Sequence, residues 1–210
     1  MTIPKIIQQI GTELKNLPGE IAHRDMIPFR ATASEALRKP INYRLSAVLL
    51  LLYNSPSGLS FILTERPKYN GSHSGQISLP GGKVEKEDKN TSITALRETE
   101  EEIGVSPNQI QLIGQLTEVY IPVSQFLIHP YIGFTPNLPP LKPDPREVQS
   151  IIHASTQDLL LKENRVMADF PVKGGKIKNV PSFNFQEKLV WGATAIILNE
   201  FKFILQRIEH

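Results

Sequence analysis

Nine residues, Leu45 to Tyr53, are apolar apart from Ser46, and this run limits the folds that are open to the chain. A strand with one face in water alternates apolar and polar residues, whereas a strand that is apolar throughout is buried on both faces. The run is too short for a membrane-spanning helix, which needs about 20 residues. It therefore predicts a strand over 44–53 inside a sheet that is covered on both sides.

The other segments alternate irregularly between helix and strand patterns. Apolar spacing predicts helices over 3–17, 91–103, 156–164 and 191–206, with a short helix near 34–38. Strands are predicted over 59–64, 109–120, 127–134 and 147–154, with hairpins at 44–64 and 175–190 and a long loop over 66–90. This order predicts an α/β fold, in which a central mixed sheet has helices on both sides.

Composition removes several classes of function. The 210 residues include no cysteine, which excludes disulfide scaffolds, zinc–thiolate sites, iron–sulfur clusters and thiol nucleophiles. Lys and Arg number 23 against 21 Asp and Glu, a balance that does not favour wholesale binding to nucleic acid or to an anionic membrane. The first residues lack the apolar core of a signal peptide. We therefore expect a cytoplasmic protein without a nucleic-acid or membrane partner.

Residues 91–103 give the clearest helix pattern, and Gly104 is placed to end that helix. On a helical projection Glu98, Glu101 and Glu102 share one side, and like charges at these spacings repel by a few tenths of a kcal/mol per pair. A divalent cation that prefers oxygen ligands, such as Mg²⁺ or Mn²⁺, would relieve that repulsion. Taken alone, the three glutamates are more often a solvated acidic face, so the neighbouring motif decides between the two interpretations.

The helix follows a Gly81-Gly82 turn, and the combined segment resembles the Nudix box, G-x5-E-x7-R-E-U-x-E-E-x-G-U, in which U is apolar. Here five residues separate Gly82 from Asp88, and eight more lead to the segment 97–105, RETEEEIGV. There are three departures from the pattern: Asp88 replaces Glu, the second spacer has eight residues instead of seven, and Thr99 takes an apolar position. The turns that carry the glutamates stay in register.

The resemblance implies a Nudix-type α/β/α sandwich and a metal-dependent hydrolase of diphosphates that are linked to another moiety. It places Glu98, Glu101 and Glu102 at the positions that bind Mg²⁺ or Mn²⁺. It gives Arg97 the role of holding these carboxylates, and Gly82 the role of bringing backbone close to the metal. Glu98 or Glu102 would also activate the attacking water.

A second motif lies upstream of the box. Leu63-Thr64-x-Arg66 is followed by His73 and then by residues 75–82, GQISLPGG. This resembles the signature of the coenzyme A diphosphatase branch, LLTxR followed by HxGQ(I/V)(S/A)FPGG. That branch also has the longer spacing and the Asp seen here, and residues 190–199 resemble its C-terminal helix. Two differences remain: Asn70-Gly71 stands where the branch usually has Leu-Arg, and Leu79 replaces Phe.

The branch resemblance implies cleavage of coenzyme A or a derivative to 4′-phosphopantetheine, or its acyl form, and adenosine 3′,5′-bisphosphate. It points to five candidate substrate-binding residues: Arg66, His73, Gly75, Gln76 and Lys83. The partner is then a small diphosphate, and a homodimer stays open because dimerisation is common in the family. Residues 1–42 are predicted to be a helical extension packed on the core, and residues 43–210 to be the Nudix domain.

Nudix enzymes often recruit a further acid from outside the box, and Glu147, at the start of the predicted strand 147–154, is our first candidate. The alternative is a surface glutamate without a role. For the whole chain two other functions stay open. One is a Nudix hydrolase of another nucleoside diphosphate, such as ADP-ribose, a dinucleoside polyphosphate or a damaged nucleotide. The other is a Nudix-fold binding or regulatory module without hydrolysis.

Overall fold

The structure is a computed structural model, and it describes residues 2–27, 32–38, 42–67, 75–172 and 175–208. Its central sheet has eight strands in the order β3-β2-β1-β7-β5, with β4 paired to β1, β6 to β7 and β8 to β2. The strands are β1 (Arg44–Ser55), β2 (Gly58–Glu65), β3 (Ile77–Ser78), β4 (Gly81–Lys83), β5 (Gln111–Gln115), β6 (Val119–Ile121), β7 (Phe126–Thr135) and β8 (Ser150–Ser155). The sheet is mixed, because β1 runs parallel to β7 and antiparallel to β2 and β4.

The central strand β1 supplies both hydrophobic cores, one on each face of the sheet. Leu50 and Leu52 belong to the core that contains Phe201, and Leu49 and Leu51 belong to the core that contains Ala95. All four leucines are fully buried. This alternation is what the unbroken apolar run predicts, since successive side chains of a strand face opposite sides.

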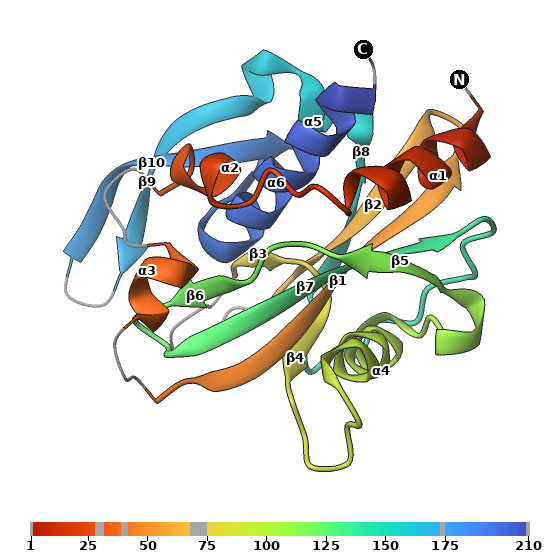
Figure 1. Cartoon of the computed structure of the whole chain (residues 1–210), viewed down its shortest axis with the longest axis horizontal. Helices are drawn as coiled ribbons and strands as arrows, with labels where there is room; N and C mark the ends of the chain where they lie inside the picture. The colour runs from red at the N-terminus through yellow and green to blue at the C-terminus, as the bar shows by residue number, and fades with distance from the viewer. Residues whose placement is uncertain (1, 28–31, 39–41, 68–74, 173–174, 209–210) are drawn as a thin grey trace.

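Helices cover both faces of this sheet (Figure 1). One face carries α4 (Thr91–Ile103), and the other carries α6 (Gly192–Ile208) with α1 (Ile3–Glu13) and α2 (Glu20–Arg24) packed against it. The short helices α3 (Ala33–Leu37) and α5 (Thr156–Leu160), with 3₁₀ turns at Pro107–Gln109 and Lys162–Asn164, complete the helical elements of the described residues. The α/β class with a mixed, helix-covered sheet is therefore confirmed.

A buried polar network joins the N-terminal segment to α6. Glu200 is fully buried, and its carboxylate accepts hydrogen bonds from the backbone N–H groups of Gly19 and Thr117, each at 3.0 Å, and from the Thr117 hydroxyl at 2.7 Å. The His23 ring nitrogen Nε2 lies 3.2 Å from Glu200 Oε2. Burial alone would raise the pKa of Glu200, but the hydrogen bonds from His23 and Thr117 outweigh burial and lower it.

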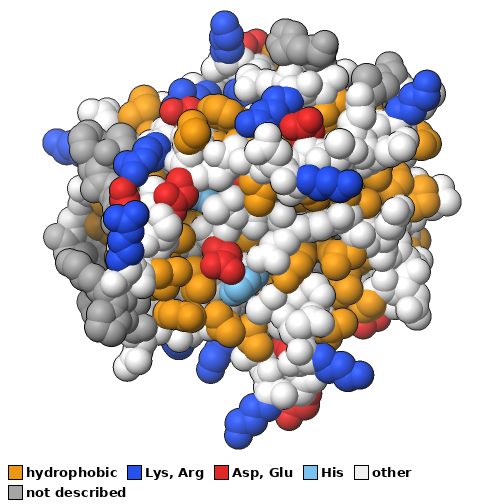
Figure 2. Space-filling view, in the orientation of Figure 1, with side chains coloured by type: hydrophobic (Ala, Val, Ile, Leu, Met, Phe, Trp, Pro, Cys, Tyr) orange, Lys and Arg blue, Asp and Glu red, His pale blue; other side chains and the backbone are white. Residues whose placement is uncertain are grey.

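A second, three-stranded antiparallel sheet lies in the order β11-β10-β9. Its strands are β9 (Arg165–Val172), β10 (Gly175–Phe185) and β11 (Lys188–Val190). Strand β11 contacts β3 of the central sheet. On the face shown in Figure 2, positive and negative side chains are both present and dispersed, as the near-neutral net charge predicts. No helix within the described residues is both long and apolar enough to cross a membrane.

Several predicted boundaries were wrong. The predicted strand over 109–120 is interrupted between β5 and β6, and the predicted long loop over 66–90 contains the short strands β3 and β4. The helix α2 and the strand β9 were not predicted. Glu147 lies in a turn at 145–147 and not at the start of a strand, because β8 begins only at Ser150. These segments are short or carry proline and glycine, so their pairing depends on distant neighbours and not on local pattern.

Candidate metal and diphosphate site

Helix α4 forms as predicted, and its ends explain why. The Asn90 side chain accepts a hydrogen bond from the Ile93 N–H at 3.1 Å, and Gly104 ends the helix in the left-handed conformation at φ 75°. Thr99 is fully buried at the apolar position of the box, and its hydroxyl donates to the Ala95 carbonyl at 2.7 Å. The departure from an apolar residue therefore leaves no unpaired hydroxyl in the core.

The three glutamates of α4 do not share one environment. At about 100° per residue, Glu102 lies roughly 40° to one side of Glu98 and Glu101 roughly 60° to the other. Glu102 turns inward and is 4 % exposed. Glu101 turns outward, and its carboxylate accepts a hydrogen bond from Arg97 Nη1 at 3.0 Å. The structure therefore brings Glu98 and Glu102 together and leaves Glu101 in an ion pair beside them.

The third carboxylate of the site comes from Glu147. Its turn is fastened at both ends by backbone hydrogen bonds: the Asp144 N–H donates to the Glu102 carbonyl at 3.0 Å, and the Gln149 N–H donates to the Glu65 carbonyl at 2.7 Å. The first bond uses a carbonyl at the C-terminal end of α4, where carbonyls lack partners within the helix. The loop thus lies across the end of α4 and directs Glu147 toward the two helix glutamates.

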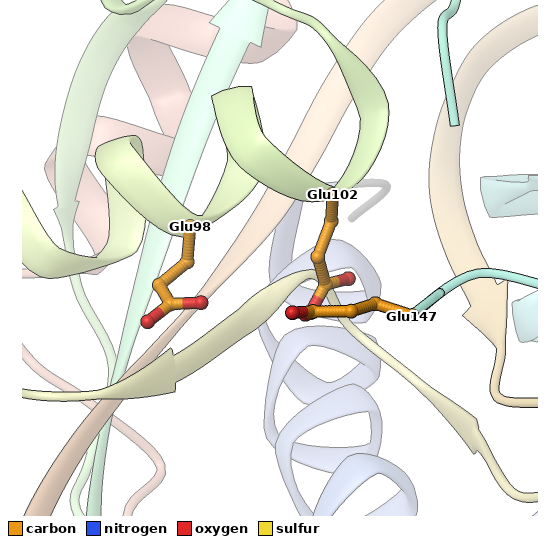
Figure 3. Close-up of side chains that lie close together, drawn as sticks. All are labelled: Glu98, Glu102 and Glu147. Atoms are coloured by element: carbon orange, nitrogen blue, oxygen red, sulfur yellow. The ribbon is translucent and has the colours of Figure 1, made fainter. Parts of the chain in front are cut away.

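Oxygen atoms of Glu98, Glu102 and Glu147, one from each carboxylate, all lie within 4.8 Å of one another. Figure 3 shows the first two descending from α4 and the third reaching them from the loop. Three carboxylates at this separation repel one another unless a cation lies between them. The donor set consists of hard oxygen atoms, so the residues fit Mg²⁺ or Mn²⁺ and do not fit a soft metal ion.

Burial raises the pKa of Glu102 to about 7, because water no longer stabilises its charged form. The Gly81 N–H donates to Oε1 and the Thr64 hydroxyl to Oε2, each at 3.3 Å. The nearby Arg66 also favours the charged form, whereas Glu147 and Glu98 oppose it. Glu102 is therefore held in place by hydrogen bonds, while its negative charge is only weakly compensated. A divalent cation bound at the site would compensate that charge.

Gly82 lies directly against Glu98. A Cβ at this position would overlap the Glu98 carboxylate, so only glycine leaves that carboxylate where it lies. Burial raises the pKa of Glu98, and Arg97, whose Nη1 is 3.0 Å from Glu98 Oε1, partly offsets that effect. Gly82 and Arg97 thus both fix the position of Glu98.

Arg97 is itself held by Asp88. The guanidinium donates to both oxygens of this carboxylate at 3.0 Å, and the Thr94 hydroxyl donates to Oδ2 at 2.8 Å. The hydrogen bonds from Arg97 hold the pKa of Asp88 far below its usual range. Arg97 also donates to the Lys83 carbonyl at 3.2 Å. Asp, one methylene shorter than the Glu of the general box, is therefore long enough to bind Arg97 here.

The candidate substrate-binding residues fall into two groups. The Arg66 N–H donates to the Gln76 carbonyl at 3.0 Å, and the Gly75 N–H donates to the Pro67 carbonyl at 3.3 Å, so Arg66, Gly75 and Gln76 lie together at the end of β2. Lys83 is an exposed residue at the end of β4, next to Gly82. His73 and Asn70-Gly71 lie outside the described residues.

Two features of this site had no role in the sequence interpretation. Thr64 is part of the LTxR motif, and in the structure its hydroxyl donates a hydrogen bond to Glu102. Alternation along β2 could have suggested this placement, since Thr64 follows the buried Ile62 by two residues. The tie between Asp144 and Glu102 left no sequence signal, because it joins backbone atoms.

The sequence of this chain is similar to a known domain profile and to those of several known proteins. The NUDIX domain profile matches residues 43–170. Nudix hydrolase 22, chloroplastic, of Arabidopsis thaliana is 35 % identical over 173 residues, which cover 76 % of this chain and 55 % of that protein. A protein described as uncharacterized Nudix hydrolase NudL of Photorhabdus laumondii is 32 % identical over 159 residues, which cover 76 % of this chain and 83 % of that protein. The chain spans about half the length of the Arabidopsis relatives.

Solved structures share the fold at low sequence identity. A MutT/nudix family protein from Enterococcus faecalis superposes with a TM-score of 0.53 at 17 % identity, covering 93 % of this chain and 78 % of that one. The MutT protein from Methanosarcina mazei Go1 gives 0.52 at 17 % identity, covering 82 % and 99 %. At this identity the likeness concerns the fold alone.

Proposed function

This chain belongs to the Nudix hydrolase family, and from that premise we propose that it hydrolyses the diphosphate bond of coenzyme A or a derivative with a divalent metal ion. The observation that carries the hydrolytic part is the convergence of Glu98, Glu102 and Glu147 beside a glycine that no other residue can replace without displacing Glu98. A folded chain gains no stability from three carboxylates held this close, so the arrangement favours a site that binds a cation over a module without a metal.

The three glutamates differ in exposure, and their proposed roles follow from that difference. A bound Mg²⁺ or Mn²⁺ would neutralise charge on the diphosphate oxygens and make a water molecule more acidic. Glu102, buried and hydrogen-bonded through both oxygens, suits a fixed ligand. Glu98 is only partly buried, so of these two acids it is the better placed to accept a proton from an attacking water. Glu147 is exposed and completes the ligand set from the side open to solvent.

The cations of the site suit a diphosphate. The charge of Arg66 opposes the larger effect of burial on the pKa of Glu102, which supports a position for Arg66 near the proposed metal site. Lys83 follows Gly82 directly. Both cations can pair with phosphate oxygens. Addition of water across the diphosphate of coenzyme A then gives 4′-phosphopantetheine and adenosine 3′,5′-bisphosphate.

The choice of coenzyme A rests on the HxGQ motif, of which Gly75 and Gln76 lie beside Arg66. A second candidate is another nucleoside diphosphate, such as ADP-ribose or a dinucleoside polyphosphate. The observation that favours it is Asn70-Gly71, which removes an arginine that the coenzyme A branch usually has. We also propose that the protein acts in the cytoplasm.

The test is a comparison of kcat/KM for coenzyme A, ADP-ribose and a dinucleoside polyphosphate with Mg²⁺ and with Mn²⁺. Coenzyme A should be the preferred substrate, and a chelator should abolish turnover. The control variant is Glu100→Gln, which removes an exposed glutamate of the same helix and should leave turnover unchanged. Faster turnover of ADP-ribose than of coenzyme A would transfer the assignment to the second candidate.

A further inference from the structure

An ion pair lies at the end of β2 on the face opposite the glutamate site. The Lys188 Nζ of β11 is 3.1 Å from Glu65 Oε1 and 2.9 Å from Oε2, and the Ser150 hydroxyl donates to Oε2 at 2.6 Å. Because neighbouring strand residues face opposite sides, Thr64 points toward Glu102 while Glu65 points away from it. The pair therefore does not belong to the proposed metal ligands.

The segment that carries Glu147 is attached to the central sheet by Glu65. Its carbonyl accepts the Gln149 N–H, and its carboxylate accepts the Ser150 hydroxyl, so both backbone and side chain hold the residues that follow Glu147. The same residue pairs with Ile77 of β3. A displacement of Glu65 would therefore reach the Glu147 turn within two or three residues.

We propose that the Lys188–Glu65 ion pair is a positioning element that holds Glu147 in place for metal binding, an inference that rests on the proposed function. The Glu147 turn has one attachment at the end of α4 and the other at Glu65, and Lys188 secures the second. The Glu65 residue is 9 % exposed. Loss of Lys188 would remove a charge-assisted contact to both oxygens of the Glu65 carboxylate, and so loosen the position from which that carboxylate holds Ser150.

The small sheet offers a matched control. The Lys176 Nζ of β10 is 3.0 Å from Asp169 Oδ2 of β9, an ion pair of similar length that is more exposed and that joins two strands of the small sheet to each other. Lys188→Met and Lys176→Met each remove one lysine charge from the same sheet. Lys188→Arg keeps the charge and should restore the function of the pair.

The experiment measures Mn²⁺ binding without substrate, from the electron paramagnetic resonance signal of free Mn²⁺, beside the melting temperature. Lys188→Met should bind Mn²⁺ about tenfold more weakly, the lower end of the effect of residues that orient metal ligands. Lys176→Met and Lys188→Arg should bind it as the unaltered protein does. Equal affinity in the two Met variants would overturn this inference and leave the proposed function intact.

Two further results are informative. Should Lys188→Met fail to fold, Ser150→Ala replaces it, because it removes one hydrogen bond and no charge; about threefold weaker Mn²⁺ binding is expected, and unchanged binding would overturn the inference. Absence of Mn²⁺ binding by the unaltered protein would overturn the proposed function, and this inference with it.

Discussion

Replacement of Glu102 by Gln separates what this residue contributes to stability from what it contributes to function. The change keeps size and shape and removes a charge from a side chain that is 4 % exposed. Without metal, burial raises the pKa of this carboxyl from 4.5 to about 7. As pH rises from about 4.5 to 7, the unfolded chain releases this proton before the folded chain does, so the unaltered protein loses stability that Glu102→Gln keeps.

The size of the effect follows from the pKa difference. About 2.5 units at 1.36 kcal/mol per unit set an upper limit of about 3 kcal/mol above pH 8, reduced by the weaker hydrogen bonds of the neutral amide. We expect Glu102→Gln to be more stable than the unaltered protein by about 1–3 kcal/mol at pH 8 in chelator. The advantage should disappear near pH 4.5, where the carboxyl is protonated in the folded chain.

Metal should offset most or all of this gain. At a Mn²⁺ concentration of 100 times its Kd the unaltered protein gains about 2.7 kcal/mol, whereas a variant that binds 100-fold more weakly gains about 0.4 kcal/mol. Hydrolysis should fall more than about 100-fold, because Glu102 is assigned as a ligand and not only as a support for one. Urea unfolding with chelator and with Mn²⁺ at pH 5 and pH 8 measures these differences in the free energy of unfolding. A variant that is less stable than the unaltered protein at pH 8 in chelator would refute the reasoning.

Three other changes test neighbouring contacts. Gly82→Ala should push the Glu98 carboxylate aside and weaken Mn²⁺ binding at least tenfold, while stability changes by about 1 kcal/mol or less, since a side-chain rotation suffices; unchanged Mn²⁺ titrations would argue against this close contact. Asp88→Asn should cost about 2 kcal/mol in urea unfolding by weakening its bonds to Arg97, and a cost below about 0.5 kcal/mol would show that the pair is dispensable. Glu200→Gln should cost about 2 kcal/mol near neutral pH. Because the folded pKa of Glu200 is lowered, that cost should shrink as pH falls below about 4.5, and a cost that stays constant down to pH 3 would contradict the charged state assigned to the network.

Local pattern was enough to predict the parts of the molecule that local forces decide. The strand over 44–53 and the helix over 91–103 follow from apolar spacing, an N-terminal cap and a terminal glycine, and the structure has both. The helix also set the relative positions of Glu98 and Glu102. The outward turn of Glu101 could have been anticipated, because Arg97 lies four residues before it.

Long-range contacts account for what the sequence did not predict. Glu147 was predicted as a further acid, but the strand that was predicted to begin at this residue was wrong. Glu147 lies in a turn whose position depends on hydrogen bonds to the carbonyls of Glu102 and Glu65, far away in the chain. The Lys188–Glu65 pair joins residues 123 positions apart, and although a hairpin over 175–190 was predicted, nothing in its pattern placed Lys188 beside the end of β2. No periodicity along the chain records such a contact.

The central claim is that the Glu98, Glu102 and Glu147 group supports metal-dependent cleavage of the coenzyme A diphosphate. Mass spectrometry of the products formed from coenzyme A with Mn²⁺ tests it most directly, with chelator and Glu102→Gln as controls. The account predicts 4′-phosphopantetheine and adenosine 3′,5′-bisphosphate in the complete reaction and in neither control. Intact coenzyme A after incubation with folded, Mn²⁺-binding protein would contradict it.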